Sequence, residues 1–166
     1  MNDNEFVNNL IEYRFMDKIW NNVIKYIIKP LDDNETVIKL LALYFVYISD
    51  GSSAMPLDKN ILTKEWNNKS ASMEILFRAL ESEELENELL MVNSIKEEGI
   101  NTIANIDELY SSIKLVGENK LFIIENSFIF ARKYYNAKNG IKDSIKRLFL
   151  DFNDECDIPF NVDEVW

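Results

Sequence analysis

The sequence feature that most constrains the fold is a run of nine apolar residues from Leu40 to Ile48. At helical spacing the run forms one apolar stripe, and Leu43, Val46 and Tyr47 make the opposite side apolar as well. A helix that is apolar on every side has to be covered on every side. We therefore predict a helix that ends at about Ser49 and lies at the centre of the core. The alternative is a helix shared between the core and a partner surface.

Glycine and proline are scarce, with four and three residues, which favours long helices over a turn-rich all-β chain. Upstream of the central helix, residues 4–13 and 15–28 are predicted to form two amphipathic helices. Pro30 interrupts the second one, and Asp33 or Asn34 is predicted to cap the helix that follows. The apolar face of the second helix is predicted from three- and four-residue spacing: Met16, Ile19, Trp20, Val23 and Ile27.

Shorter elements are predicted after the central helix. Residues 54–57 are expected to be extended, residues 73–80 to form a short helix, and Ser82 to cap another helix. A spacing typical of a capping box, which predicts the start of a short helix, occurs twice: at Ser94 and Glu97, and at Asn105 and Glu108.

The pattern changes near the C-terminal end. Two short β-rich runs flank Glu125-Asn126-Ser127, and because Asn tolerates positive φ, residues 120–130 are predicted to form a β-hairpin. The helical period returns from about Ala131 to Phe152, with Gly140 as a weak point.

These elements predict a mainly α, compact multi-helix domain with one small β-hairpin. Residues 1–166 are expected to be a single domain. Its parts are a helical region at 1–113, the hairpin with its long helix at 115–152, and an acidic tail at 153–166.

The residue inventory limits the chemistry. The chain has no histidine, which excludes Ser-His-Asp and Cys-His nucleophile systems and histidine-ligated metal sites. It has one cysteine, Cys156, whose acidic neighbours oppose a reactive thiolate. With four glycines and no G-x-x-x-x-G-K-[ST] motif, we predict no phosphate-cradling loop. We expect no catalytic residue, cofactor or metal site in this chain.

Charge is distributed unevenly. The net charge of -11 argues against a stand-alone nucleic-acid binder. One acidic run is interpreted as the solvated face of a helix rather than a divalent-cation site. Its members are Glu81, Glu83, Glu84, Glu86, Glu88, Glu97 and Glu98.

Residues 132–147 contain six basic side chains against one acid, Asp143. The stretch is interpreted as a solvated helix face or a contact with an acidic partner surface. Because two tyrosines lie beside this stretch and aromatic rings can stack on bases, a surface that binds single-stranded DNA is an alternative interpretation. Among the aromatic residues, Trp66 and Trp166 are predicted to be exposed, because both lie in polar surroundings in the sequence.

The hairpin and its neighbours resemble a known family. Residues 116–134, VGENKLFIIENSFIFARKY, resemble a stretch of the RecD family that reads roughly P-L-V-L-x-G-D-R-L-Y-L-x-R-Y-W. Residues 38–57 resemble the family's apolar helix followed by G-H-V-C-L-x-L. In the first match, Asn126 takes the position of the turn Asp, Phe128-Ile129-Phe130 that of Leu-Tyr-Leu, Arg132 that of the Arg and Tyr134 that of the Trp.

The resemblance implies the N-terminal domain of RecD, the alpha subunit of exodeoxyribonuclease V, a helicase-nuclease of DNA repair and recombination. It implies an all-α domain with a small hairpin that docks on a RecC-like subunit, in an assembly with a RecB-like subunit. ATP and magnesium binding, helicase activity and most DNA contacts would belong to domains beyond Trp166. This stretch itself would not be an enzyme.

The partner-facing region is predicted to be the hairpin and the basic helix. A stand-alone acidic α-helical interaction or inhibitor protein is the alternative, and single-stranded DNA binding through residues 131–147 is a third hypothesis. Residues 1–13 lack the basic start of a secretory signal, and no run reaches the ~18 apolar residues of a membrane span, so we expect a cytoplasmic protein without a membrane contact. The predicted interface residues are Phe128, Arg132, Tyr134, Tyr135, Lys138, Lys142 and Lys146.

Overall fold

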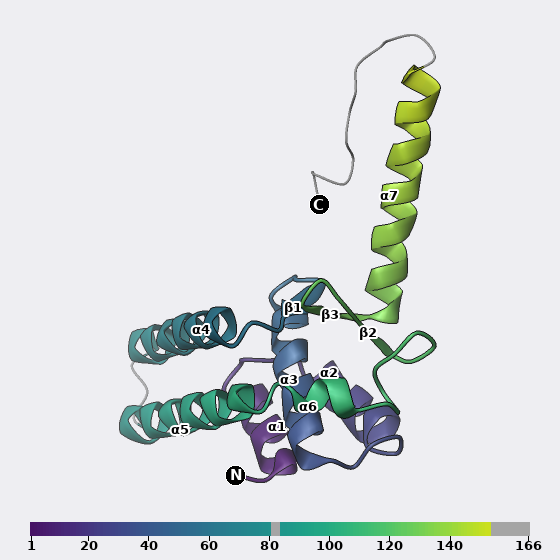
Figure 1. Cartoon of the computed structure of the whole chain (residues 1–166). Coiled ribbons are helices and arrows are strands. Elements are labelled where there is room, and N and C mark those ends of the chain that lie inside the picture. The colour runs from purple at the N-terminus through teal and green to yellow at the C-terminus, as the bar shows by residue number, and fades with distance from the viewer. Residues whose placement is uncertain (81–83, 154–166) are drawn as a thin grey trace.

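The central helix, α3 (Glu35–Ser49), is surrounded by the other elements (Figure 1). The computed structural model describes residues 1–80 and 84–153, with side chains described up to residue 146. Asn34 caps α3, its Oδ1 accepting hydrogen bonds from the backbone N–H groups of Thr36 at 2.9 Å and Val37 at 3.3 Å. Every residue from Val37 to Val46 is buried. The predicted central helix is confirmed.

The first helix, α1 (Asp3–Glu12), matches the prediction, but the second one begins later than expected. The chain turns after α1 through Arg14, whose φ is 60°, and the N–H groups of Phe15 and Met16 both bond to the carbonyl of Leu10. Residues 15–18 are therefore held in a turn. Helix α2 (Ile19–Val23) starts only after it.

The predicted apolar face of this second helix is partly wrong. Helix α2 continues as a π-helical turn, η1 (Ile24–Ile28), in which each hydrogen bond spans one more residue than in an α-helix. Within the wider turn Ile24 and Ile28 are buried while Ile27 is exposed, and Ile19, which precedes the turn, is exposed as well. A plain 3.6-residue period does not anticipate this pattern.

Helices α4 (Lys59–Ala79) and α5 (Leu85–Ala104) lie side by side and extend away from α3 (Figure 1). The prediction of a short helix at 73–80 is wrong, because α4 begins at Lys59, where Asp58 caps it. Its first turns carry few apolar residues, and α5 covers the sparse buried face of Leu62, Trp66 and Phe77.

The prediction that Trp66 is exposed is also wrong. Its side chain is 3% exposed, and its indole Nε1 donates a hydrogen bond to the carbonyl of Lys96 at 2.9 Å. Polar neighbours in the sequence point to other sides of α4. The Trp66 side chain is buried because α5 runs alongside α4.

Neither predicted capping box forms a side-chain cap, although the second of the two predicted short helices is present. Ser94 lies inside α5, since Val92, Ile95 and Gly99 continue its buried face without a break. The Asn105 side chain donates back to the carbonyl of Asn101 instead of capping, and a short helix, α6 (Glu108–Ser111), follows. Continuous burial along one face outweighs a local capping pattern.

The predicted hairpin is confirmed. Strands β2 (Phe122–Glu125) and β3 (Phe128–Ala131) are joined by Asn126 and Ser127, with φ angles of 49° and 62°. Two successive positive φ angles give a turn whose twist matches that of the strands. A third strand, β1 (Ala54–Pro56), pairs antiparallel with β3, with Ala54 opposite Phe130. The sheet order is β1-β3-β2.

Helix α7 (Arg132–Asn153) follows β3 directly and confirms the predicted long helix. The N–H of Ala131, the last residue of β3, donates to the hydroxyl of the buried Tyr44 in α3 at 2.8 Å. The base of α7 contacts β2 and β3. Its upper turns rise clear of the other described elements (Figure 1).

The protein is therefore mainly α-helical with a small antiparallel sheet, as predicted. Within the described residues no helix combines the length and apolar character that crossing a bilayer requires. The predictions for Glu81, Ser82, Glu83, Cys156 and Trp166, and for the acidic tail from residue 154, fall outside the described residues.

Candidate protein-interaction site

A groove of about 520 Å³ lies between the sheet and the base of α7. We call it the hairpin–helix groove. Strands β1 and β3 contribute apolar side chains to it, the end of β2 and the hairpin turn contribute polar ones, and α7 contributes one amide and two lysines. Its lining residues are Ala54, Glu125, Asn126, Phe128, Phe130, Lys138, Asn139 and Lys142.

The aromatic part of the groove is formed by β3. Phe128 is 41% exposed and Phe130 is buried, with their ring centroids 6.4 Å apart. The ammonium of Lys138 lies 4.8 Å from the centroid of the Phe130 ring and 5.2 Å from that of Tyr135. A cation at this distance from an aromatic face is attracted to it. The lysine is therefore held over the rings.

Glu125 joins the hairpin to α7. Its carboxylate pairs with the Lys138 ammonium and accepts a hydrogen bond from the Tyr135 hydroxyl at 2.9 Å. The hydrogen bond from Lys138 lowers the pKa of Glu125 below its ordinary value, against partial burial, and Tyr135 and the charge of Lys142 also lower it. Glu125 is thus an ionised link between turn and helix.

Beyond the groove, α7 carries an apolar stripe that we call the α7 stripe, made of Tyr134, Ile141 and Ile145. Helical spacing places these three residues on one face. Tyr134 packs against the core, whereas Ile141, two turns further on, is 54% exposed. Lys138 lies on this face between Tyr134 and Ile141, and Lys142 lies next to it on the side of the groove. A partly uncovered apolar face is thus bordered by basic residues.

The predicted interface residues differ in their position relative to the groove. Phe128, Lys138 and Lys142 line the groove, and Tyr135 supports Glu125 beneath it. Lys146 lies one turn above Lys142 on α7, outside the groove lining.

Two predicted interface residues serve the fold. The Arg132 guanidinium donates to the carbonyls of Lys120 at 2.6 Å and Gly117 at 3.0 Å, and also to that of Glu118. It clamps the loop before β2. Tyr134 is half-buried against the core. Their polar and aromatic groups are therefore directed into the domain.

Sequence reasoning missed several groove residues. Ala54 belongs to β1, and its nearness to Phe130 depends on pairing between residues that are 76 positions apart in the sequence. Glu125 and Asn126 were recognised only as turn residues. The signal for Glu125 was available, because a carboxylate at a hairpin turn that precedes a basic helix is positioned to pair with it.

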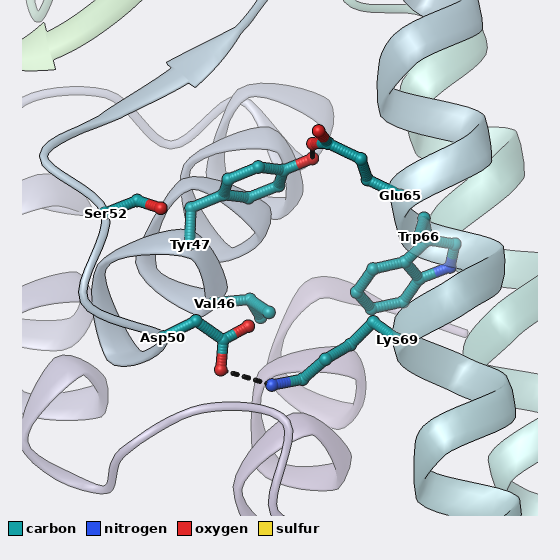
Figure 2. Close-up of a pocket in the computed structure, with 7 residues that line it drawn as sticks. All are labelled: Val46, Tyr47, Asp50, Ser52, Glu65, Trp66 and Lys69. Atoms are coloured by element: carbon teal, nitrogen blue, oxygen red, sulfur yellow. Dashed lines mark hydrogen bonds and ion pairs between the residues drawn. The ribbon is translucent and has the colours of Figure 1, made fainter.

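A second pocket, of about 260 Å³, lies between the C-terminal end of α3 and α4 (Figure 2). The Tyr47 hydroxyl donates to Glu65 at 2.5 Å, and Lys69 pairs with Asp50. Burial raises the pKa of Tyr47 far above its ordinary value, and the bond to Glu65 raises it further. Figure 2 shows the two polar pairs on opposite sides of the pocket. They tie α3 to α4.

The acidic run is divided in the structure. Glu86 and Glu97 are exposed, as expected of a solvated face. Glu98 instead accepts a hydrogen bond from Lys39 of α3 at 2.8 Å. Within residues 1–80 and 84–153 no group of three or more Asp, Glu or Cys side chains is arranged to hold a metal ion.

The hairpin–helix groove and the α7 stripe together form the candidate interaction site, because they combine exposed apolar area with a local reversal of the chain's charge. Comparison of the chain with protein-family models, with curated proteins and with solved structures found no match.

Proposed function

We propose that this chain is a non-catalytic docking domain of a RecD-like subunit of exodeoxyribonuclease V. In this proposal it packs against a RecC-like subunit, in an assembly that includes a RecB-like subunit and works in DNA double-strand-break repair in the bacterial cytoplasm. The observation that carries the proposal is the α7 stripe, in which Ile141 is 54% exposed on a helix that extends away from the other described elements (Figure 1).

An uncovered apolar helix face favours association. Burial of apolar surface stabilises a complex by roughly 25 cal/mol per Å². A partner that covers the stripe therefore forms a more stable complex with each apolar side chain that it removes from water. Exposed apolar surface rimmed by polar residues is typical of protein interaction sites. The lysines beside the stripe provide such a rim.

The sequence resemblance and the groove involve the same hairpin. Asn126, Phe128 and Phe130 carry part of the resemblance to RecD and also line the hairpin–helix groove. The proposal assigns ATP and magnesium, together with most DNA contacts, to helicase domains outside this chain. The chain then contributes assembly rather than chemistry.

The test is reconstitution with RecC-like and RecB-like subunits encoded in the same genome. The purified chain should co-elute with the RecC-like subunit in size-exclusion chromatography. Lys142→Glu combined with Lys146→Glu should weaken the complex, because charge reversal at an interface penalises association. Lys64→Glu combined with Lys114→Glu is the matched control, with the same charge change at exposed positions away from α7.

Two results would contradict the proposal. ATP hydrolysis by the purified chain is incompatible with a non-catalytic domain. Failure to bind either subunit, with a correctly folded chain, would favour the stand-alone acidic interaction or inhibitor protein instead.

A further inference from the structure

We propose that Gly140 is a hinge of α7, at which the upper part of the helix, residues 141–153, bends relative to a base, residues 132–139, that stays fixed on the sheet. The hinge is a property of the chain alone and goes beyond the proposed docking function. Its use in docking, where the upper part adjusts its direction to a bound protein, rests on that function.

The base of α7 is attached to the rest of the domain by its side chains. Tyr134 packs against the core. Tyr135 and Lys138 both bond to the carboxylate of Glu125, at the end of β2. These attachments join the base to the core and to the hairpin, and Lys138 lies only two residues before Gly140. The base can therefore stay in place while the helix above it moves.

The packing of the domain does not require a glycine at position 140. Outside the helix itself, nothing in the described part of the chain lies within 4 Å of a Cβ atom placed there. The backbone is helical and its φ is not positive, so a left-handed conformation does not require glycine either. Glycine is among the least favourable residues in a helix interior, because it gives the backbone more freedom than other residues. Its effect at this position is to weaken the helix locally.

A second residue weakens the same turn of α7. The Ser144 hydroxyl donates a hydrogen bond to the carbonyl of Gly140 at 2.8 Å. In an α-helix this carbonyl also accepts the N–H of residue 144, so the hydroxyl competes with the backbone for one acceptor. A serine bonded in this way tends to bend a helix, and kinks are found at Gly and Ser pairs. The turn from Gly140 to Ser144 is therefore where α7 bends most easily.

The upper part of α7 has fewer attachments than the base. The helix contacts β2 and β3 at its base, and its upper turns rise clear of the other described elements (Figure 1). Ile141, directly after the glycine, is 54% exposed. Lys142 reaches the groove, but its long and flexible side chain can follow a change in the direction of the helix. Bending at Gly140 thus breaks little tertiary packing, which is the main source of stability for a helix in a protein.

Hydrogen exchange of backbone amides, measured by NMR on the full chain, tests the hinge. The N–H groups of residues 141–144 bond to the carbonyls of residues 137–140, so these hydrogen bonds open when α7 bends at Gly140. The variants are Gly140→Ala and Ser144→Ala. The matched control is Ala137→Gly, which places a glycine in the fixed base. Residual dipolar couplings of the same amides report how the upper part is oriented relative to the base.

We expect protection from exchange at residues 141–144 to be at least about tenfold lower than at residues 136–139 and 145–148. Gly140→Ala should raise protection at residues 141–144 about fivefold, as the difference in helix propensity predicts, and Ser144→Ala about twofold. Ala137→Gly should produce no such minimum at residues 138–140, because the attachments of the base lie on both sides of it. The dipolar couplings should be averaged to smaller values above Gly140 than below it, and Gly140→Ala should remove this difference.

Fraying from the end of α7 gives a different pattern, in which protection rises steadily from Asn153 towards the base without a minimum after Gly140. That pattern would overturn the hinge. So would an unchanged exchange pattern in Gly140→Ala, or dipolar couplings that fit one rigid helix in the native chain. Because the experiment uses the chain without a partner, these results leave the proposed docking on a RecC-like subunit to its own test.

Discussion

Gly99 of α5 lies directly against the indole ring of Trp66 of α4. A Cβ atom at position 99 would be 2.2 Å from both Cε2 and Nε1 of that ring. The ring is held in place by burial and by its hydrogen bond to the carbonyl of Lys96. The close approach of α4 and α5 therefore depends on the absence of a side chain at this position.

Gly99→Ala should destabilise the protein by about 1–3 kcal/mol, because the ring has no room to move away in a packed core. Helix propensity alone predicts the opposite, a gain of about 1 kcal/mol. Urea unfolding followed by circular dichroism measures the difference. The control is Gly140→Ala in α7, where nothing lies within 4 Å of the added Cβ. It should stabilise the protein by about 0.5–1 kcal/mol. A stabilising Gly99→Ala would mean that the two helices are further apart than described.

Tyr44→Phe should destabilise the protein by about 1–2 kcal/mol, since the Ala131 N–H loses its acceptor at the end of β3. The ring and its edge-on contact with Phe122 are retained, so the change isolates the hydroxyl. Hydrogen exchange at the Ala131 amide should also become faster. Tyr26→Phe, at an exposed position, serves as the comparison and should leave stability unchanged.

Stability should also fall at alkaline pH because of Tyr44. Burial raises the pKa of Tyr44 to about 12 from an ordinary value of 10.0. Because the pKa is higher in the folded state, the contribution of the neutral Tyr44 hydroxyl to stability is fully present below pH 10.0. It is lost as pH rises through about 12. Urea unfolding across this range should show a shallower decline for Tyr44→Phe than for the native chain. Parallel declines would refute the assignment to Tyr44.

Lys39→Met should lower the free energy of unfolding by about 3 kcal/mol, although the methionine largely preserves the aliphatic part of the side chain. Lys39 is 9% exposed, and its ammonium bonds to Glu98 at 2.8 Å, Glu35 at 2.7 Å and the carbonyl of Met1 at 2.6 Å. Burial lowers the pKa of Lys39, but the hydrogen bonds to Glu35 and Glu98 outweigh it and raise the pKa above its ordinary value.

The matched control for Lys39→Met is an exposed ion pair. Lys59 and Asp107 are 2.8 Å apart, with side chains 46% and 78% exposed. Lys59→Met should change the free energy of unfolding by less than about 1 kcal/mol, because water screens such a pair. Thermal and urea unfolding of both variants give the comparison. Equal losses would show that burial does not strengthen the Lys39 network.

The link between Glu125 and Lys138 should make the stability of the hairpin sensitive to acid. Because the folded-state pKa of Glu125 is lowered, its contribution is fully present above its ordinary value of 4.5 and is lost as pH falls through the folded pKa. Lys138→Met should therefore be less stable than the native chain at neutral pH. The difference in stability between Lys138→Met and the native chain should disappear well below pH 4.5. A difference that persists in acid would indicate that Lys138 acts through the aromatic rings alone.

The elements that could be predicted were those whose signals are local. Asn34, one of the two predicted caps of α3, caps it through its own side chain, and Asn126 supplies the positive φ of the hairpin turn, so both signals could be recognised in short segments. The start of α4 was missed because Lys59–Lys64 carry little apolar periodicity of their own. Ser94 was wrongly predicted to start a helix. It lies inside α5, whose buried face continues on both sides of it, and a capping pattern inside a helix does not mark a helix start.

The candidate site was predicted in part. Phe128, Lys138 and Lys142 were identified because they lie near one another in the sequence, on the hairpin and on successive turns of one helix. Ala54 was not, because only strand pairing brings β1 beside β3. The hydrogen bonds of Arg132 to the loop before β2 were not predicted either, because they depend on how that loop folds back.

Local sequence patterns were enough to predict a mainly helical chain, a central helix that is apolar on every side, and a basic last long helix. These properties follow from composition and periodicity, which act over a few turns. Which faces meet depends on how the helices and strands pack: Trp66 packs on Gly99, Glu98 turns inward to Lys39, and Ile141 of the α7 stripe stays exposed beside the groove. Such contacts join residues far apart in the chain, and their energy depends on close packing that no local pattern encodes.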